Sequence, residues 1–163
     1  MATWRLYNNI QASLYDFISA QATSDSLTDI AGNSINFRVG RKDNDDWDLP
    51  LITFYVDSEN STRLEIGSFA RDDLQTVIVD VYALTETDRL DLAKWVVDTI
   101  NNGWTYYVYS DNGSDPDSPT KVESGRINVQ SFIENTRVNL GQNVDKYDQH
   151  RHRISISVFK SGS

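Results

Sequence analysis

The feature that most restricts the fold is a strict alternation of apolar and polar residues near the C-terminus. Ile154, Ile156 and Val158 alternate with Ser155 and Ser157. Successive side chains of a β-strand point to opposite faces, so this period of two predicts a strand with one buried face and one solvated face. The chain must therefore form a sheet whose apolar face is covered by another layer.

Other segments are rich in β-branched and aromatic residues and are bounded by turn-forming residues, which is typical of strands. We predict strands at residues 35–39, 51–56, 63–67, 74–83 and 104–109, and one long strand or a bent hairpin at 122–138. The polar residues 58–61 predict a turn that joins 51–56 and 63–67 into a hairpin.

The segment 74–83 is the best candidate for a central strand. Its three valines point to one face, and the other face combines Ile78 and Tyr82 with Asp80. A carboxylate in such a strand is either the buried partner of an arginine or the marker of a polar face. Arg71 and Arg89 are the candidate partners.

Two segments have the spacing of amphipathic helices. The first places apolar residues at steps of three and four and is expected to end near Gln21, before a polar, turn-forming stretch. The second follows Thr85, has acidic residues in its first turn, and is expected to stop at Gly103. The apolar stripes are Leu6, Ile10, Leu14, Phe17 and Ile18 in the first helix, and Leu90, Ala93, Val97 and Ile100 in the second.

The order of these elements predicts an α+β fold. It consists of one twisted, mainly antiparallel or mixed sheet with two α-helices packed on one face, because a strict alternation of strands and helices is absent. The 163 residues fit a single domain, 1–163. Residues 41–50 and 110–121 have the charged, proline- or glycine-containing composition of long loops.

The composition excludes several functional classes. The chain has no cysteine, so disulfides, thiolate metal sites and cysteine nucleophiles are impossible. Its net charge of −9 repels phosphate backbones and anionic lipids, which argues against general nucleic-acid or membrane binding. No apolar run has the ~20 residues that a membrane-spanning helix needs.

Motifs for catalysis are missing as well. No glycine-rich phosphate loop, dinucleotide fingerprint or nucleophile elbow can be written from this sequence, so we expect neither an enzyme nor a cofactor. His150 and His152 lie two residues apart and, with Asp145 or Asp148, could ligate a metal as in a hydrolase. Their arginine neighbours oppose a cation, so we favour partly exposed imidazoles and no metal site.

Two further clusters of residues can be interpreted either as ordinary structural features or as binding sites. Asp43, Asp45, Asp46 and Asp48 offer oxygen ligands but lack the glycine and late glutamate of a calcium loop, which favours a solvated acidic loop. Trp104, Tyr106, Tyr107 and Tyr109 could stack on sugars, as in a carbohydrate-binding domain, but such residues more often fill a core. Trp47 beside Leu49 instead suggests contact with another protein subunit.

Four segments together resemble the tail terminator, or tail completion, proteins of tailed bacteriophages. They are the helix at 6–18, the proline-ended loop before Leu51–Phe54, the strand 76–82 that runs directly into the helix 87–100, and the closing strand 153–158. The likeness is one of architecture and size, spans nearly the whole chain and contains no diagnostic motif. The loop at 111–121 departs from a compact terminator.

The resemblance implies a structural virion protein of the tail or neck, assembled in the host cytoplasm. Such a protein forms a ring, commonly a hexamer, which stops polymerisation of the tail tube and joins the tail to the neck. The implied partners are the chain itself, the tail tube protein, a neck or head-completion protein and, in a contractile tail, the sheath protein; DNA only passes through the pore. A head–tail connector is the nearest alternative.

The resemblance implies a subunit interface and a pore, and two groups of residues are candidates for them. Trp47 and Leu49 are the candidate anchors in a neighbouring subunit, since aromatic anchors dominate interfaces. Asp43, Asp45, Asp46 and Asp48 are the candidate acidic lining of the pore, where negative charge keeps DNA from adhering. The alternative for the acidic residues is that they only confer solubility.

Overall fold

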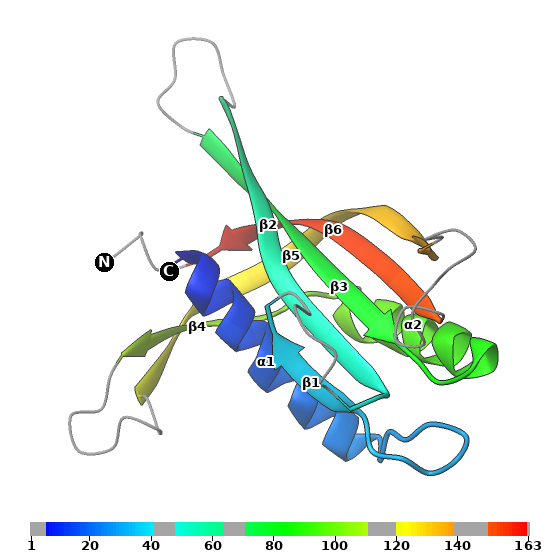
Figure 1. Ribbon diagram of the computed structural model, residues 1–163. Helices are drawn as coiled ribbons and strands as arrows, with labels where there is room; N and C mark the ends of the chain where they lie inside the picture. Colours follow the sequence, from blue (N-terminus) through cyan, green and yellow to red (C-terminus); the bar gives the residue numbers. More distant parts are fainter. Residues whose placement is uncertain (1–5, 41–47, 64–70, 111–119, 139–149, 163) are drawn as a thin grey trace.

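The computed structural model describes residues 6–40, 48–63, 71–110, 120–138 and 150–162. It contains two helices and a six-stranded sheet with the strand order β1-β2-β3-β6-β5-β4 (Figure 1). The elements along the chain are α1 (Leu6–Ser24), β1 (Asn36–Val39), β2 (Leu51–Arg63), β3 (Arg71–Tyr82), α2 (Glu86–Ile100), β4 (Trp104–Ser110), β5 (Thr120–Arg137) and β6 (Arg151–Ser161). The predicted α+β fold is confirmed.

The sheet is mixed, because β1 runs parallel to β2 while all other neighbours are antiparallel. β3 lies between β2 and β6, as predicted for the central strand. Its alternation is also confirmed: Val77, Val79 and Val81 lie in the hydrophobic core, and Asp80 faces the opposite side.

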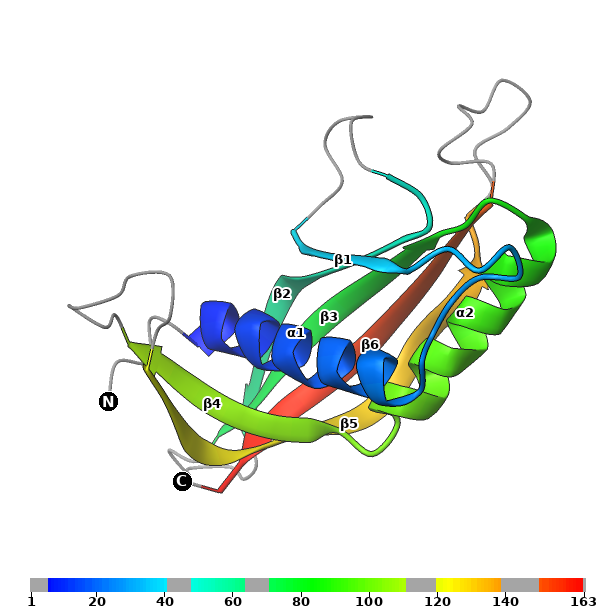
Figure 2. The same cartoon turned by 90° about the horizontal axis from the view of Figure 1, so that it is seen from below.

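Both helices cover the same face of the sheet (Figure 2). Ile10, Leu14 and Ile18 of α1 enter one core with Ala93 and Ile100 of α2 and the inner side chains of the strands. Leu90, predicted on the stripe of α2, is instead 53% exposed. α2 begins where predicted, because the Thr85 hydroxyl accepts a hydrogen bond from the backbone N–H of Asp88 at 3.1 Å. After its end, Gly103 has a φ of +74°, and a Cβ there would lie 2.0 Å from the carbonyl oxygen of Ile127, so the position requires glycine.

α1 closes the gap between the two ends of the curled sheet, with β1 on one side and β4 on the other (Figure 2). The Ser13 hydroxyl accepts from Tyr107 N–H at 2.9 Å and lies 3.4 Å from the Tyr107 carbonyl, to which it donates. Asn9 Oδ1 accepts from Tyr109 N–H at 3.4 Å. On the opposite side, Gln11 Oε1 accepts from Val56 N–H at 3.0 Å. Helix side chains therefore satisfy strand amides that lack a neighbouring strand.

The hairpin predicted at 51–67 is wrong. Residues 58–61 continue β2 to Arg63, and β2 pairs over its whole length with β3, from Leu51 opposite Tyr82 to Arg63 opposite Arg71. The register shifts by one residue at a bulge between Val56 and Ser58, and the pairing continues beyond it. Pairing with a neighbouring strand has overridden the local turn composition, and residues 64–67 lie outside the described residues.

Two smaller boundaries also differ from the prediction. α1 continues to Ser24, three residues beyond Gln21, before the chain turns. Residues 110, 120 and 121 of the predicted loop belong to strands, and 111–119 lie outside the described residues. Of the two alternatives for 122–138, the long strand is confirmed, because β5 runs from Thr120 to Arg137.

The face of β6 predicted to be solvated is buried. Ser155 and Ser157 are 5% and 9% exposed, because β6 is flanked by β3 and β5. Side chains of β5 cover the two serines: Ser157 donates to Gln130 at 3.2 Å, and Ser155 lies 3.5 Å from Glu134. Serine tolerates this burial because its hydroxyl retains hydrogen-bond partners.

The ends of β2 and β3 project from the sheet as a two-stranded arm, defined here as residues 60–63 and 71–74 (Figure 1). β1 pairs with β2 only as far as Phe54, and β6 pairs with β3 only from Gln75 onward. Among the described residues, the arm strands therefore pair only with each other. Four residue pairs carry the arm about 13 Å beyond the sheet.

Substitution of Ser13 by alanine tests whether α1 seals the edge of β4. The Tyr107 amide would lose its acceptor in a part-buried position, so we expect the free energy of unfolding to fall by about 1–2 kcal/mol. Urea denaturation measures the change. Thr23→Ala is the matched control, because Thr23 is exposed on the same helix and its hydroxyl donates to the carbonyl of Ser19 within that helix. Equal losses in the two variants would contradict the sealing role.

Candidate functional site

Asp80 is the centre of a buried ion-pair cluster on the face of the sheet opposite the helices. Its side chain is 2% exposed. Arg153 binds it with two donors, Nε to Oδ1 at 2.9 Å and Nη2 to Oδ2 at 3.0 Å, and Arg151 Nη2 donates to Oδ2 at 2.9 Å. These hydrogen bonds raise the pKa of Arg153 above its ordinary value. The predicted arginine partner is present, but the two named candidates were wrong.

The true partners come from β6 because Asp80 is directly opposite Arg153 in the antiparallel pairing of β3 and β6. Arg89, one of the two candidates, instead contacts Glu86 and His152. Both oxygens of Asp80 are occupied by guanidinium groups, which favours a structural role for the carboxylate and leaves it poorly placed to accept a proton from a substrate.

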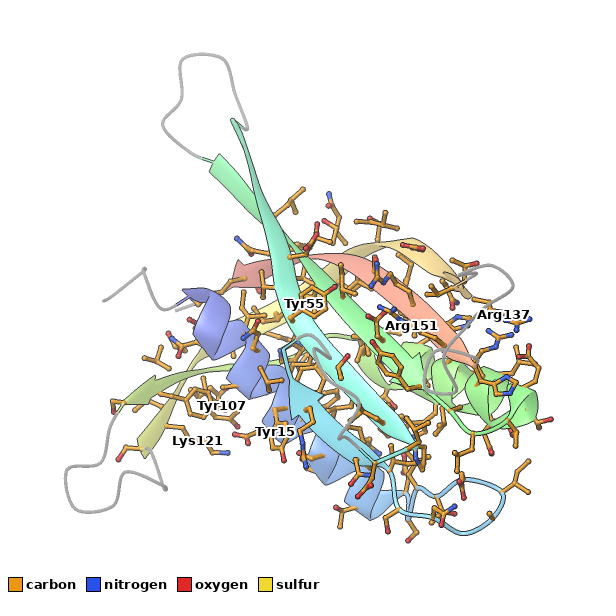
Figure 3. All side chains as sticks on the ribbon, viewed as in Figure 1. Tyr15, Tyr55, Tyr107, Lys121, Arg137 and Arg151 are labelled. Carbon is orange, nitrogen blue, oxygen red and sulfur yellow. The ribbon has the colours of Figure 1, made fainter. Side chains whose placement is uncertain are left out.

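A polar cavity of about 240 Å³ lies above this cluster. Figure 3 labels two of its lining side chains, Tyr55 of β2 and Arg151 of β6. The other lining residues are Asp57, Ile78, Asp80, Tyr82 and Arg153. Arg151 also stacks over the ring of Tyr82, with 5.1 Å from its guanidinium carbon to the ring centre. Arg151 therefore links two of the lining side chains, Asp80 and Tyr82.

The two histidines, predicted as possible metal ligands, have separate partners. His150 Nδ1 lies 3.5 Å from Glu86 Oε2. His152 is buried, with Nε2 2.6 Å from Asn135 Oδ1 and Nδ1 in contact with Arg89 Nη1. Within the described part of the chain, no group of three or more metal-ligand side chains forms. Asp145 and Asp148 lie outside the described residues.

Burial and the charge of Arg89 favour the neutral form of His152. Burial lowers the pKa of His152, and the charge of Arg89 lowers it further. A neutral His152 accepts from Arg89 through Nδ1 and donates to Asn135 through Nε2, and this ties β6 to both α2 and β5. The hydrogen bonds from Arg89 also lower the pKa of Glu86 from 4.5 to about 2.

The four aromatic residues of β4 do not form one exposed surface on which a sugar could stack. Trp104 and Tyr106 are buried in the core, as the core interpretation predicted. Tyr107 and Tyr109 are half-buried, with ring centres 6.3 Å apart in an edge-to-face arrangement. Tyr109 donates to Asp16 at 2.6 Å, and Lys121 lies over the Tyr107 ring, as Figure 3 shows. These two tyrosines help to fasten β4 to α1 and β5.

The residues predicted for the subunit interface and the pore are only partly described. Asp43, Asp45, Asp46 and Trp47 lie outside the described residues. Asp48 is exposed, and its carbonyl accepts from the Asn36 side chain at 3.3 Å. Leu49 is half-buried and precedes a cis peptide bond to the buried Pro50. Their roles as interface anchor and pore lining remain predictions.

β1 presents an open backbone edge. The backbone N–H groups of Asn36 and Gly40 donate to the carbonyls of Pro50 and Phe54. The backbone groups of the even-numbered residues therefore point toward β2. Because backbone groups alternate along a strand, the N–H and C=O of Phe37 and Val39 point away from β2. Arg38 Nη1 donates to the Phe37 carbonyl at 3.1 Å, and among the described residues no strand pairs with this side of β1.

A groove of about 370 Å³ runs beside this edge, between β1 and the C-terminal turn of α1. Its apolar lining comes from Ala22, Leu27, Ile35 and Phe37, and serines and threonines complete it. The sequence did not reveal this surface, because nothing in residues 35–39 shows on which side a neighbour will pair. Only the pairing with β2 identifies the open side.

The other strand edges are less accessible. Asn9 and Ser13 of α1 occupy the backbone groups of β4 at Tyr107 and Tyr109. The part of β5 beyond β4 contains two bulges, between Val129 and Ser131 and between Phe132 and Glu134, which twist a strand away from regular pairing. In the described chain, β1 and the arm are therefore the regular edges open to another strand.

Comparisons with known proteins leave the family of this chain open. No protein-family model matches the chain, and no curated protein matches it. Neither described helix is long and apolar enough to span a membrane.

The Asp80 cluster predicts a large effect for Asp80→Asn. Removing the carboxylate leaves two arginines facing each other in a part-buried position, so we expect a loss of about 3 kcal/mol in the free energy of unfolding. Asp98→Asn is the control, since its pair with Lys94 is exposed and a change within about 0.5 kcal/mol is expected. Chemical denaturation of both variants measures these changes. A decrease of less than about 1 kcal/mol in the free energy of unfolding of Asp80→Asn would refute the structural role.

The lowered pKa of His152 predicts that acid weakens the fold. The unfolded chain binds a proton near pH 6.5 more readily than the folded chain, so stability is complete above this pH and decreases as the pH falls through it. We expect His152→Gln to reduce this loss, measured as unfolding free energies in urea at pH 7.5 and 5.5.

Glu86 does not interfere in this window, because its contribution is lost only as the pH falls from 4.5 toward 2. His150→Gln serves as the matched control and should retain the dependence due to His152. An unchanged pH dependence in His152→Gln would show that this residue does not control the acid response.

Proposed function

We propose that this protein is a structural component of a phage tail that forms a ring at the end of the tail tube, as a tail terminator does. The observation that carries the proposal is the arm, a two-stranded ribbon that extends from the sheet without a third strand among the described residues. An isolated two-stranded hairpin is only marginally stable in water. An arm of this kind gains stability by packing on another subunit.

The placement of the open edges favours a ring over a two-fold dimer. The arm and β1 are different surfaces of one molecule, and a contact between different surfaces joins subunits head to tail. Such a contact closes into a ring when the rotation between neighbours divides a full turn. The helix-covered core and the ion pairs of the opposite face then act as a rigid frame that holds the two surfaces in a fixed relation.

The charge of the chain is consistent with passage of DNA through such a ring. The net charge of −9 opposes binding of a polyanion, which suits a channel wall that DNA must slide along. Asp48, the described member of the acidic loop, is exposed and free to contribute to this field. The same features fit a head–tail connector, which also forms a ring around DNA.

The test of this proposal combines imaging with a capping assay. We expect the purified protein to show rings with a central hole in negative stain, and its sedimentation coefficient to rise with concentration. Added to polymerising tail tube protein of the same phage, it should stop tube growth and bind the tube end. Rings that bind portal protein and not tube ends would assign the connector role, whereas a monomer that leaves tube length unchanged would refute both.

A further inference from the structure

We infer that the open edge of β1 is the docking site for the arm of a second copy of this chain, which adds a strand to the sheet of its neighbour. The inference rests on the proposed ring-forming function and specifies which two surfaces meet. Its occupant is a second copy, because the arm supplies what β1 lacks: a regular strand with backbone groups directed away from its own partner.

The backbone geometry of β1 suits the addition of a short strand. Phe37 N–H, Val39 N–H and Val39 C=O point outward, and the strand is regular across its four residues. Val39 is 42% exposed, although its neighbour Phe37 is buried. Strand addition obtains affinity from such main-chain groups and specificity from pockets that receive alternate side chains. The groove lined by Ala22, Leu27, Ile35 and Phe37 lies beside this edge and provides such a pocket.

The arm has the length and open edge to fill this position. β2 is paired with β1 only up to Phe54, so the same side of β2 is without a strand partner from Ser58 to Arg63 in the described chain. This stretch is longer than the four residues of β1, and therefore the docking strand can cover the whole edge. Because the two edges belong to different ends of the molecule, each copy can give one arm and receive one.

Proline at position 39 tests the β1 edge directly. Val39→Pro removes the outward N–H and leaves the pairing with β2 intact, because Val39 does not donate to β2. We expect the self-association constant measured by sedimentation to fall at least about tenfold. Val39→Thr retains the N–H and is the matched control, which should associate like the unchanged protein. Equal association of the two variants would overturn the inference.

Shortening the arm tests the other surface. Glu59 and Gln75 are directly paired, so replacing residues 60–74 by Asn-Gly joins them with a two-residue hairpin turn and removes the arm together with residues 64–70. We expect this variant to keep its cooperative thermal unfolding and to lose self-association as Val39→Pro does. Retained self-association in a folded variant would contradict the inference.

Disulfide trapping shows whether the two surfaces touch. The chain has no cysteine, so Val39→Cys in one preparation and Ser61→Cys or Thr62→Cys in a second provide single thiols. On mixing and oxidation we expect a mixed disulfide dimer, because the bond requires Cα atoms within about 7 Å. Asp98→Cys, exposed on α2, replaces the arm thiol as the control for random collision. A mixed disulfide no more abundant than this control would overturn the inference.

These outcomes separate the inference from the proposed function. Trapping of β1 with the arm, in a protein that fails to cap tail tubes, supports the contact and refutes the terminator role. Rings that cap tubes but show neither the mixed disulfide nor sensitivity to Val39→Pro support the terminator role and refute the contact.

Discussion

The structure depends on the way in which α1 completes the sheet. A curled six-stranded sheet has two ends, and its strand amides must be satisfied where no further strand follows. Ser13 and Asn9 satisfy β4 on one side of the helix, and Gln11 satisfies β2 on the other. The same helix inserts Ile10, Leu14 and Ile18 into the core. α1 is therefore both a packing layer and a substitute for a strand.

The opposite face of the sheet is stabilised in a different way. No described helix covers it, yet Asp80, Tyr82 and Ser155 are buried there. Long side chains from neighbouring strands cover this face, with Arg151 and Arg153 on Asp80 and Glu134 near Ser155. On the helix-covered side, His152 at one end of β6 contacts Arg89 of α2. Each of these contacts joins elements far apart in the sequence, so the frame resists shear between strands.

The edges of the sheet differ in how readily they accept another strand. A rigid sheet with one sealed edge, one bulged edge and one regular open edge restricts where another strand can be added. Within the described residues, the arm and β1 remain as the regular strand edges without a further strand partner. In the polar cavity over Asp80, the carboxylate is bound by Arg151 and Arg153, so its charge is compensated within the sheet.

The sequence by itself determined the local elements, since spacing along the chain reflects which side chains can share a face. It predicted the start of α2 at Thr85, the two faces of β3 and the burial of Trp104 and Tyr106. Only the tertiary structure decided what depends on strand neighbours: the parallel pairing of β1, the continuation of β2 through residues 58–61, the burial of Ser155, and Arg151 and Arg153 as partners of Asp80. The physical reason is that register between distant strands selects these contacts, and a local pattern contains no information on which strand will lie alongside.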